Sequence, residues 1–192
     1  MRSTFLHLIP ASFALLLASC ATGPPPEQTQ MLKDHTAMMA ADSAEQAMQK
    51  AREDAVTAMF KMYESGSTEG LENYMAEGFV DHTPPPGMEV KGMQGFKDMM
   101  ATMIKGWSNN KVSIHSMAHQ GDNVFVHYNW AGDNTGEMMG MPATNKSIDV
   151  AGVEIFKFDG AKATEHWGYF EEMKMMTQLG LMPDPAAAPK KK

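Results

Sequence analysis

Apolar residues in the first half of the chain follow the 3.6-residue period of an amphipathic helix. From about Asp42 onward they recur three, four and seven residues apart, as in the set Val56, Met59, Phe60 and Tyr63. Ser43 can cap this helix at its start, and Gly66 is expected to end it. Two further helices are predicted at residues 67–79 and 95–107.

Beyond Trp107 the chain changes to long segments rich in β-branched and aromatic residues, which are typical of strands. The predicted strands are residues 111–120, 123–132, 146–158 and 162–171. Tight-turn sequences join the first to the second and the third to the fourth. Helices followed by such a meander predict an α+β fold, in which N-terminal helices pack on a curved antiparallel sheet. The concave side of that sheet leaves room for a pocket.

The last predicted strand places four notable residues two apart, so an extended chain turns them to one side: Glu165, Trp167, Tyr169 and Glu171. One interpretation is a pocket wall, in which burial raises the pKa of a carboxyl group so that it can accept a proton. The alternative is that Glu165 pairs with a lysine of a neighbouring strand while Glu171 caps the following helix. We prefer the surface alternative for Glu165 and leave both open for Glu171.

Other candidate ligand-binding residues come from the helix and from the second strand. His82 precedes a rigid proline-rich turn and is a candidate pocket residue, with a loop histidine bonded to a backbone carbonyl as the alternative. His127 alternates with Trp130 and its neighbours along the second strand, so only one of the two sets can face inward. Tyr63 joins these candidates from the helix.

Composition narrows the classes of function. The formal net charge is −7 and the only basic run is 190–192, which argues against nucleic acid as a partner. Among seven histidines only His115 and His119 lie four apart, a spacing too open for zinc chelation in a strand, so no metal site is expected. The 21 methionines fit flexible core filler, with Cu(I) binding or oxidant scavenging as the alternative.

The N-terminal residues resemble a bacterial lipoprotein signal. An Arg2-bearing start and an apolar stretch lead to Leu-Ala-Ser-Cys at 17–20, and the resemblance implies cleavage before Cys20, which then carries the lipid. An ordinary secretory signal with an incidental cysteine is the alternative. We expect a protein anchored in the cell envelope, arranged as a signal peptide (1–19), an extended tether (20–42), a folded domain (43–183) and a flexible tail (184–192).

Three blocks of sequence resemble the SnoaL-like polyketide cyclases of the nuclear-transport-factor-2-like (NTF2-like) superfamily. They are FVDHTPPPG at 79–87, the segment 121–144, and the segment 158–180 with its Glu-x-Trp strand and terminal Gln-Leu-Gly. The resemblance covers roughly residues 47–183. It implies a cone-shaped α+β fold that binds a small hydrophobic molecule, needs no cofactor, and forms a homodimer through the outer face of its sheet.

The same resemblance implies acid–base chemistry of the cyclase or isomerase type. The general base of the family is an aspartate, and Glu171 occupies the matching position with one methylene more. His82 also matches the pattern, whereas Asn134 stands where many members have histidine. The alternative to an enzyme is a non-catalytic envelope lipoprotein that binds a ligand or a protein partner.

Overall fold

The computed structural model describes residues 25–138 and 140–183 of the chain. Its elements, in chain order, are α1 (Pro26–Ser65), a 3-10 helix (Leu71–Asn73), β1 (Met75–Asp81), α2 (Gly92–Lys105), β2 (Trp107–Gln120), β3 (Asn123–Asn134), β4 (Ser147–Asp159), β5 (Lys162–Phe170) and α3 (Glu172–Gln178). The chain divides into two compact units, Met1–Ala44 and Glu45–Lys192. The second unit contains the sheet and the cavity described below.

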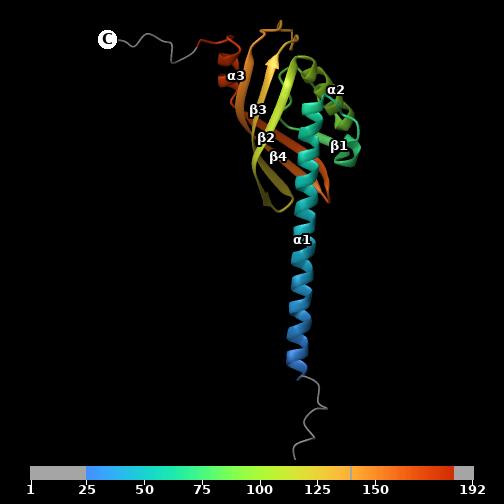
Figure 1. Cartoon of the computed structure of the whole chain (residues 1–192). Coiled ribbons are helices and arrows are strands. Elements are labelled where there is room, and N and C mark those ends of the chain that lie inside the picture. The colour runs from blue at the N-terminus through green and yellow to red at the C-terminus, as the bar shows by residue number, and fades with distance from the viewer. Residues whose placement is uncertain (1–24, 139, 184–192) are drawn as a thin grey trace, which may run out of the picture. The chain divides into compact units, whose positions relative to one another are not determined.

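The five strands form one sheet in the order β1-β5-β4-β3-β2 (Figure 1). The pairs β2–β3, β3–β4 and β4–β5 are antiparallel, as the meander predicted. Strand β1 pairs parallel with β5 and makes the sheet mixed. The expected α+β class, with helices packed on a curved sheet, is confirmed.

Strand β1 corrects the prediction of a helix over residues 67–79. Only one 3-10 turn forms there, and the following residues are extended, with Met75, Phe79 and Asp81 buried. The edge of β5 favours the strand, because the backbone N–H of Ala163 donates to the carbonyl of Tyr74 at one end of the pairing. Tertiary pairing has overridden a helix-like spacing of apolar residues.

Helix α1 begins at Pro26, not at Ser43, so the expectation of an extended tether over 20–42 is wrong for residues 26–42. Proline suits the first helical position because its fixed φ is already helical and no N–H is lost there. Most of the residues that follow are strong helix formers such as Ala, Gln, Met and Lys. The signal segment 1–19, Cys20 and the tail 184–192 lie outside the described residues. Among the described helices, none is long and apolar enough to cross a membrane.

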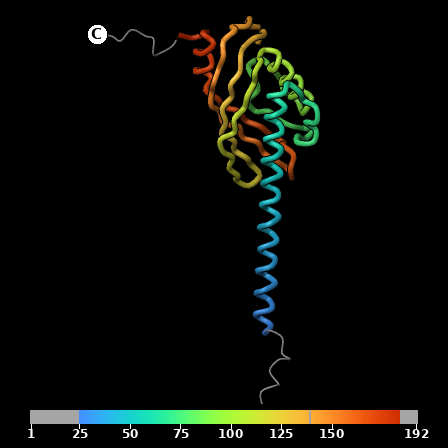
Figure 2. Tube along the Cα trace, in the orientation of Figure 1, coloured from blue at the N-terminus to red at the C-terminus, as the bar shows by residue number. Residues whose placement is uncertain are grey.

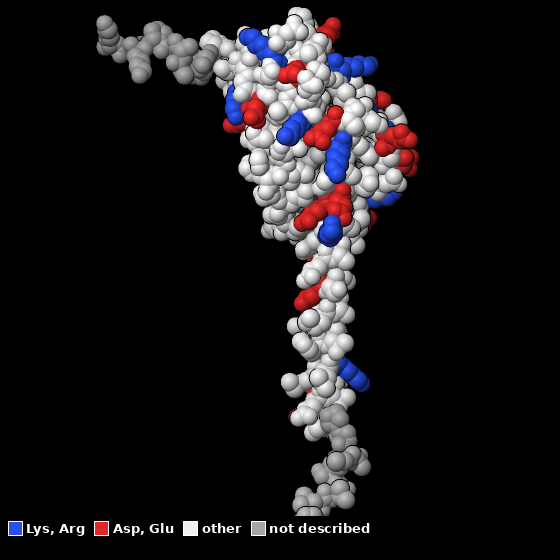
Figure 3. Space-filling view, viewed as in Figure 1, with Lys and Arg blue, Asp and Glu red and all other residues white. Residues whose placement is uncertain are grey.

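The core of the second unit lies between α1, α2 and the inner face of the sheet (Figures 1 and 2). Val56 of α1 is fully buried against Val124 and Val126 of β3, and Phe96 of α2 closes the same cluster. On the face of this unit that Figure 3 shows, acidic and basic side chains are interspersed, without a continuous basic patch.

A β-bulge decides which residues of β5 face this core. The β4–β5 pairing matches Phe158 with Ala163 and Lys157 with Glu165, so Thr164 is the extra residue. Side chains alternate strictly along a strand, and one inserted residue reverses the alternation beyond it. After the bulge, Glu165 therefore faces outward and His166 faces inward.

Candidate functional site

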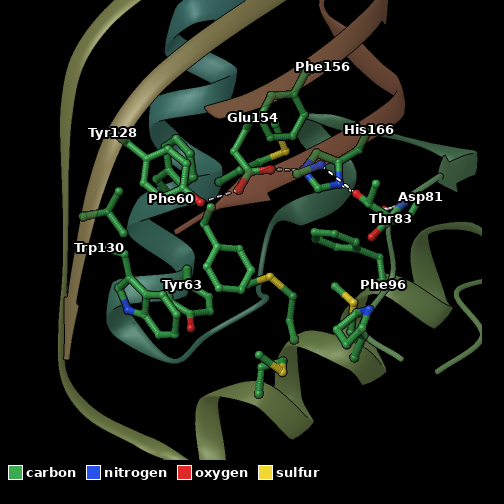
Figure 4. Close-up of a pocket in the computed structure, with 18 of the residues that line it drawn as sticks. Phe60, Tyr63, Asp81, Thr83, Phe96, Tyr128, Trp130, Glu154, Phe156 and His166 are labelled. Carbon is green, nitrogen blue, oxygen red and sulfur yellow. Dashed lines mark hydrogen bonds and ion pairs between the residues drawn. The ribbon is translucent and has the colours of Figure 1, made fainter. Parts of the chain in front are cut away.

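A cavity of about 200 Å³ opens between α1, α2 and the inner face of the sheet. Most of its wall is apolar, and seven of its side chains are phenylalanine, tyrosine or tryptophan: Phe60, Tyr63, Phe96, Tyr128, Trp130, Phe156 and Phe170. Four methionines add flexible, polarisable surface: Met59, Met99, Met100 and Met103. The charged groups Asp81, Glu154 and His166 gather at one end (Figure 4).

His166 occupies the polar end, held between two carboxylates (Figure 4). Its Nδ1 lies 3.2 Å from Oδ1 of Asp81, and its Nε2 is hydrogen-bonded to Oε2 of Glu154. The Asp81 side chain is only 2% exposed and that of His166 12% exposed. Buried charges are stable only when they are paired in this way, so the three residues act as one network.

The protonation of His166 follows from its surroundings. Burial lowers the pKa of His166, but hydrogen bonds and charges from Asp81 and Glu154 outweigh burial and raise it to about 9. At neutral pH the ring is therefore an imidazolium, and both ring nitrogens donate. This charge holds the two carboxylates in fixed positions at the end of the cavity.

Two tyrosines complete the polar groups. The Tyr128 hydroxyl donates to Oε1 of Glu154 at 2.6 Å, and burial followed by the charge of Glu154 raises the pKa of Tyr128 far above its usual value. Burial also raises the pKa of Tyr63. The Tyr63 hydroxyl has no hydrogen-bond partner among the described residues. It is therefore a free donor on the cavity wall.

Two glycines on the inner sheet face make room for this network. A Cβ on Gly168, which pairs with Glu154 across β4 and β5, would lie 2.7 Å from Oε2 of Glu154. A Cβ on Gly152 would lie 2.7 Å from the Tyr128 hydroxyl oxygen. Real Cβ atoms do not approach other atoms so closely, so both positions must lack a side chain.

Thr83 fixes the carboxylate of Asp81 from the other side. The backbone N–H of Thr83 donates to Oδ1 of Asp81 at 2.9 Å, and the Thr83 hydroxyl accepts from the N–H of Gly168 at 2.7 Å. The proline-rich turn after β1 is thereby tied to β5 at the edge of the cavity. Both Thr83 and Pro85 line the cavity.

Of the residues selected from the sequence, Tyr63 and Trp130 line the cavity. Their rings meet edge to face with centroids 5.6 Å apart. The indole N–H of Trp130 is already used, because it donates to Oδ1 of Asn110 at 3.1 Å. These two residues form the aromatic end of the cavity, away from His166 (Figure 4).

Glu171 does not face the cavity, which corrects the prediction of a buried base there. Its side chain is 46% exposed, and it accepts from the N–H of Ala151 at 2.9 Å and from Lys174 at 2.8 Å. The backbone hydrogen bond, followed by Lys174, lowers the pKa of Glu171. Glu171 thus occupies the position before α3, as the alternative interpretation proposed, but its carboxylate makes no capping hydrogen bond and instead connects β4 to Lys174.

Glu165, Trp167 and His82 form a separate cluster on the outer face of the sheet, so none of them lines the cavity. The rings of His82 and Trp167 stack with centroids 4.3 Å apart. Glu165 lies 2.6 Å from Lys157 and 2.8 Å from His82, and both contacts lower the pKa of Glu165. The surface pairing preferred for Glu165 is the one that forms.

His127 also lies on the outer face, where its ring is exposed 5.0 Å from that of His115. The inward set of β3 is the apolar one, which includes Tyr128 and Trp130. The strand was ambiguous in sequence because both sets contain a ring with a polar atom. Burial of the larger aromatics decides between them.

Asn134 has a structural role. Its side chain is buried and donates to the carbonyls of Gly106 and Gly136, while its carbonyl oxygen accepts from the N–H and hydroxyl of Thr144. The residue thus joins the α2–β2 connection to the β3–β4 connection beside the sheet. Asparagine can do this because it carries a donor and an acceptor in one plane.

Sequence reasoning missed His166, Glu154, Asp81 and Thr83. The alternation of β5 was read correctly from Glu165, but alternation alone does not say which set faces inward, and the carboxylates and tryptophan of the outer set suggested a pocket wall. One usable signal was present, because Glu154 interrupts the apolar run of β4. A lone acid inside such a run predicts a buried and paired carboxylate.

Comparison with known proteins gives a family and a fold. A family model described as SnoaL-like polyketide cyclase matches residues 53–179. Curated protein sequences give no match. No group of three or more metal-ligating side chains occurs among the described residues.

Among solved structures, TsrD from Streptomyces laurentii is 16% identical with a TM-score of 0.63, covering 69% of this chain and 97% of its own. A candidate SnoaL-like polyketide cyclase from Jannaschia sp. CCS1 is 21% identical with a TM-score of 0.60, covering 70% and 94%. A candidate polyketide cyclase from Bacillus cereus is 25% identical with a TM-score of 0.57, covering 67% and 79%. These likenesses support the α+β fold described above.

Proposed function

The chain belongs to the SnoaL-like polyketide cyclase family, in the NTF2-like superfamily, and we propose that its cavity binds a small hydrophobic molecule. The observation that carries this proposal is the buried Asp81–His166–Glu154 network at one end of an apolar cavity. An apolar hollow with a few convergent polar groups is the usual form of a ligand site. A cavity of about 150 Å³ holds benzene, so about 200 Å³ suits a molecule of one or two rings.

We further propose that the site transfers a proton at a carbon next to a carbonyl group, with Glu154 as general base. Both Glu154 oxygens accept hydrogen bonds, but each carboxylate oxygen has a second lone pair that can take a substrate proton. The imidazolium of His166 stabilises negative charge that develops beside it. Asp81 holds that imidazolium in place and acts as a positioning residue.

Tyr63 supplies the second element of this mechanism. Removal of the proton leaves an enolate, whose oxygen needs a hydrogen-bond donor. The Tyr63 hydroxyl has no partner among the described residues, and burial raises its pKa further above neutral, so it is a protonated donor at pH 7. The steps need no cofactor, since the proton moves between substrate carbon, Glu154 and solvent.

Hydrogen–deuterium exchange tests the chemistry without knowledge of the natural substrate. 2-Tetralone in D₂O loses its proton signals beside the carbonyl, and the rate is followed by NMR with and without protein. We expect the protein to accelerate exchange and Glu154→Gln to reduce that acceleration by about 10²- to 10⁴-fold, the usual contribution of a general base. Glu171→Gln is the matched control and should exchange as the wild type does. Unchanged exchange in Glu154→Gln would contradict the assignment of the base.

A non-catalytic binding protein is the second candidate, and one observation favours it. Both ring nitrogens of His166 and both oxygens of Glu154 already have partners, as in a network that only stabilises the cavity. This candidate predicts that 2-tetralone binds to the wild type, measured by calorimetry, while its exchange rate stays at that of buffer. Binding with exchange supports the enzyme instead.

The envelope anchor remains a proposal that rests on the resemblance at the N-terminus. We propose that Cys20 carries a lipid that anchors the chain in the membrane. Bacteria grown with labelled palmitate should label the wild-type chain and not Cys20→Ala. Equal labelling of the two chains would contradict lipidation at this residue.

A further inference from the structure

The charged groups on the cavity wall do not balance. Among the described lining residues, Asp81 and Glu154 carry carboxylates and His166 carries the one cationic group, which leaves one negative charge in excess. Lysine and arginine do not occur in that part of the wall. A buried excess charge attracts the opposite charge strongly, because water screens it poorly.

Three basic residues of the domain form ion pairs outside the cavity, so they do not balance its excess negative charge. Lys157 lies on the outer face of the sheet, paired with Glu165 at 2.6 Å. Lys97 of α2 pairs with Glu72 at 3.1 Å. Arg52 donates to Asp122 at the 2.9 Å typical of an ion pair, and also to two backbone carbonyls. Each of these cations is therefore bound to groups outside the cavity.

The aromatic end of the cavity also favours a positively charged ligand. The faces of aromatic rings attract cations, tryptophan and tyrosine most strongly. Tyr63 and Trp130 present such rings at this end. Phe60 and Tyr128 also line the cavity, and their ring centroids lie 5.1 Å apart. An ammonium group is also a triple donor, and the cavity offers it acceptors in Glu154 and in the oxygen of Tyr63.

We infer that the cavity selects a small hydrophobic amine, bound as its ammonium ion, over neutral or anionic molecules of the same shape. The inference deepens the proposed function and rests on it, because it concerns the same cavity. Combined with the proposed proton transfer, it assigns the substrate to carbonyl compounds of one or two rings that carry a basic amine. Carboxylate and phosphate ligands are disfavoured, since each would add a further negative charge beside Glu154.

Three single-ring probes test this selectivity on the full chain at pH 7. Benzylamine, benzyl alcohol and benzoate share a ring and differ in charge, and their dissociation constants are measured by calorimetry. We expect benzylamine to bind at least tenfold more tightly than benzyl alcohol, and benzoate to bind most weakly. Glu154→Gln should bring benzylamine close to the affinity of benzyl alcohol. Glu171→Gln, the same change at an exposed carboxylate, should leave all three constants unchanged.

The outcomes separate this inference from the proposal beneath it. Benzyl alcohol or benzoate binding as tightly as benzylamine would overturn the charge preference and leave the cavity as a ligand site. Failure of all three probes to bind would overturn the proposed ligand site itself. Because the comparison of the probes is made on the wild-type chain, the test stands even if Glu154→Gln does not fold.

Discussion

Titration of His166 gives the sharpest test of the buried network. An unfolded chain has a histidine pKa of about 6.5, whereas the folded chain holds the pKa of His166 at about 9. The pKa is raised on folding, so the stabilisation is fully present below pH 6.5 and is lost as the pH rises through 9. The difference of about 2.5 pKa units, at about 1.4 kcal/mol each, amounts to about 3 kcal/mol of unfolding free energy.

Chemical denaturation measures this quantity directly. The free energy of unfolding of the wild type is compared with that of His166→Gln at several pH values between 6.5 and 9.5, so that groups titrating alike in both chains cancel. We expect the wild type to lose about 3 kcal/mol across that range relative to the variant, whose side chain does not titrate. NMR of the imidazole signals should show His166 still protonated at pH 8. Parallel pH profiles for the two chains, or a neutral ring at pH 8, would refute the reasoning.

Three further substitutions test the packing around the site. Gly168→Ala should destabilise the fold by about 1–3 kcal/mol and weaken ligand binding, because the new Cβ meets the Glu154 carboxylate. Gly78→Ala, which places its Cβ in open space, is the control and should do neither. Urea denaturation compares the stabilities of the two variants. Asn134→Ala should cost about 2–4 kcal/mol, since it removes a buried side chain that donates to two carbonyls and accepts from the N–H and hydroxyl of Thr144. Glu171→Gln should lower the thermal midpoint slightly and leave ligand binding intact.

The helices and the meander could be predicted because each has a period that its own residues reveal. The strands β2 to β5 and the turns at Gly121 and Gly160 lie where the sequence placed them. Strand β1 could not be predicted in this way, because only its pairing with β5 distinguishes it from a helix. Local patterns report local structure, and a parallel partner distant in sequence leaves no local trace.

The candidate site was missed for a related reason. The sequence placed Trp130 on the correct strand but left open which side of that strand faces inward, and the candidates taken from β5 belong to its outer set. Alternation divides the side chains of β5 into two sets, but only its pairing with β4, which matches His166 with the buried Phe156, shows which set faces inward. The cavity residues Asp81 and His166 come from strands far apart in the chain, so no spacing motif connects them.

The two glycines beside the buried network can be used to compare the sequences of related proteins. Gly168 and Gly152 leave the space that Glu154 and Tyr128 occupy, so a single methyl group at either position takes that space away. A relative with alanine or serine matching Gly168 must lack the buried acid or hold it in another pose. Glycine at these two positions therefore serves as a sequence marker. It distinguishes family members that keep the buried acid in this pose from those that share only the fold.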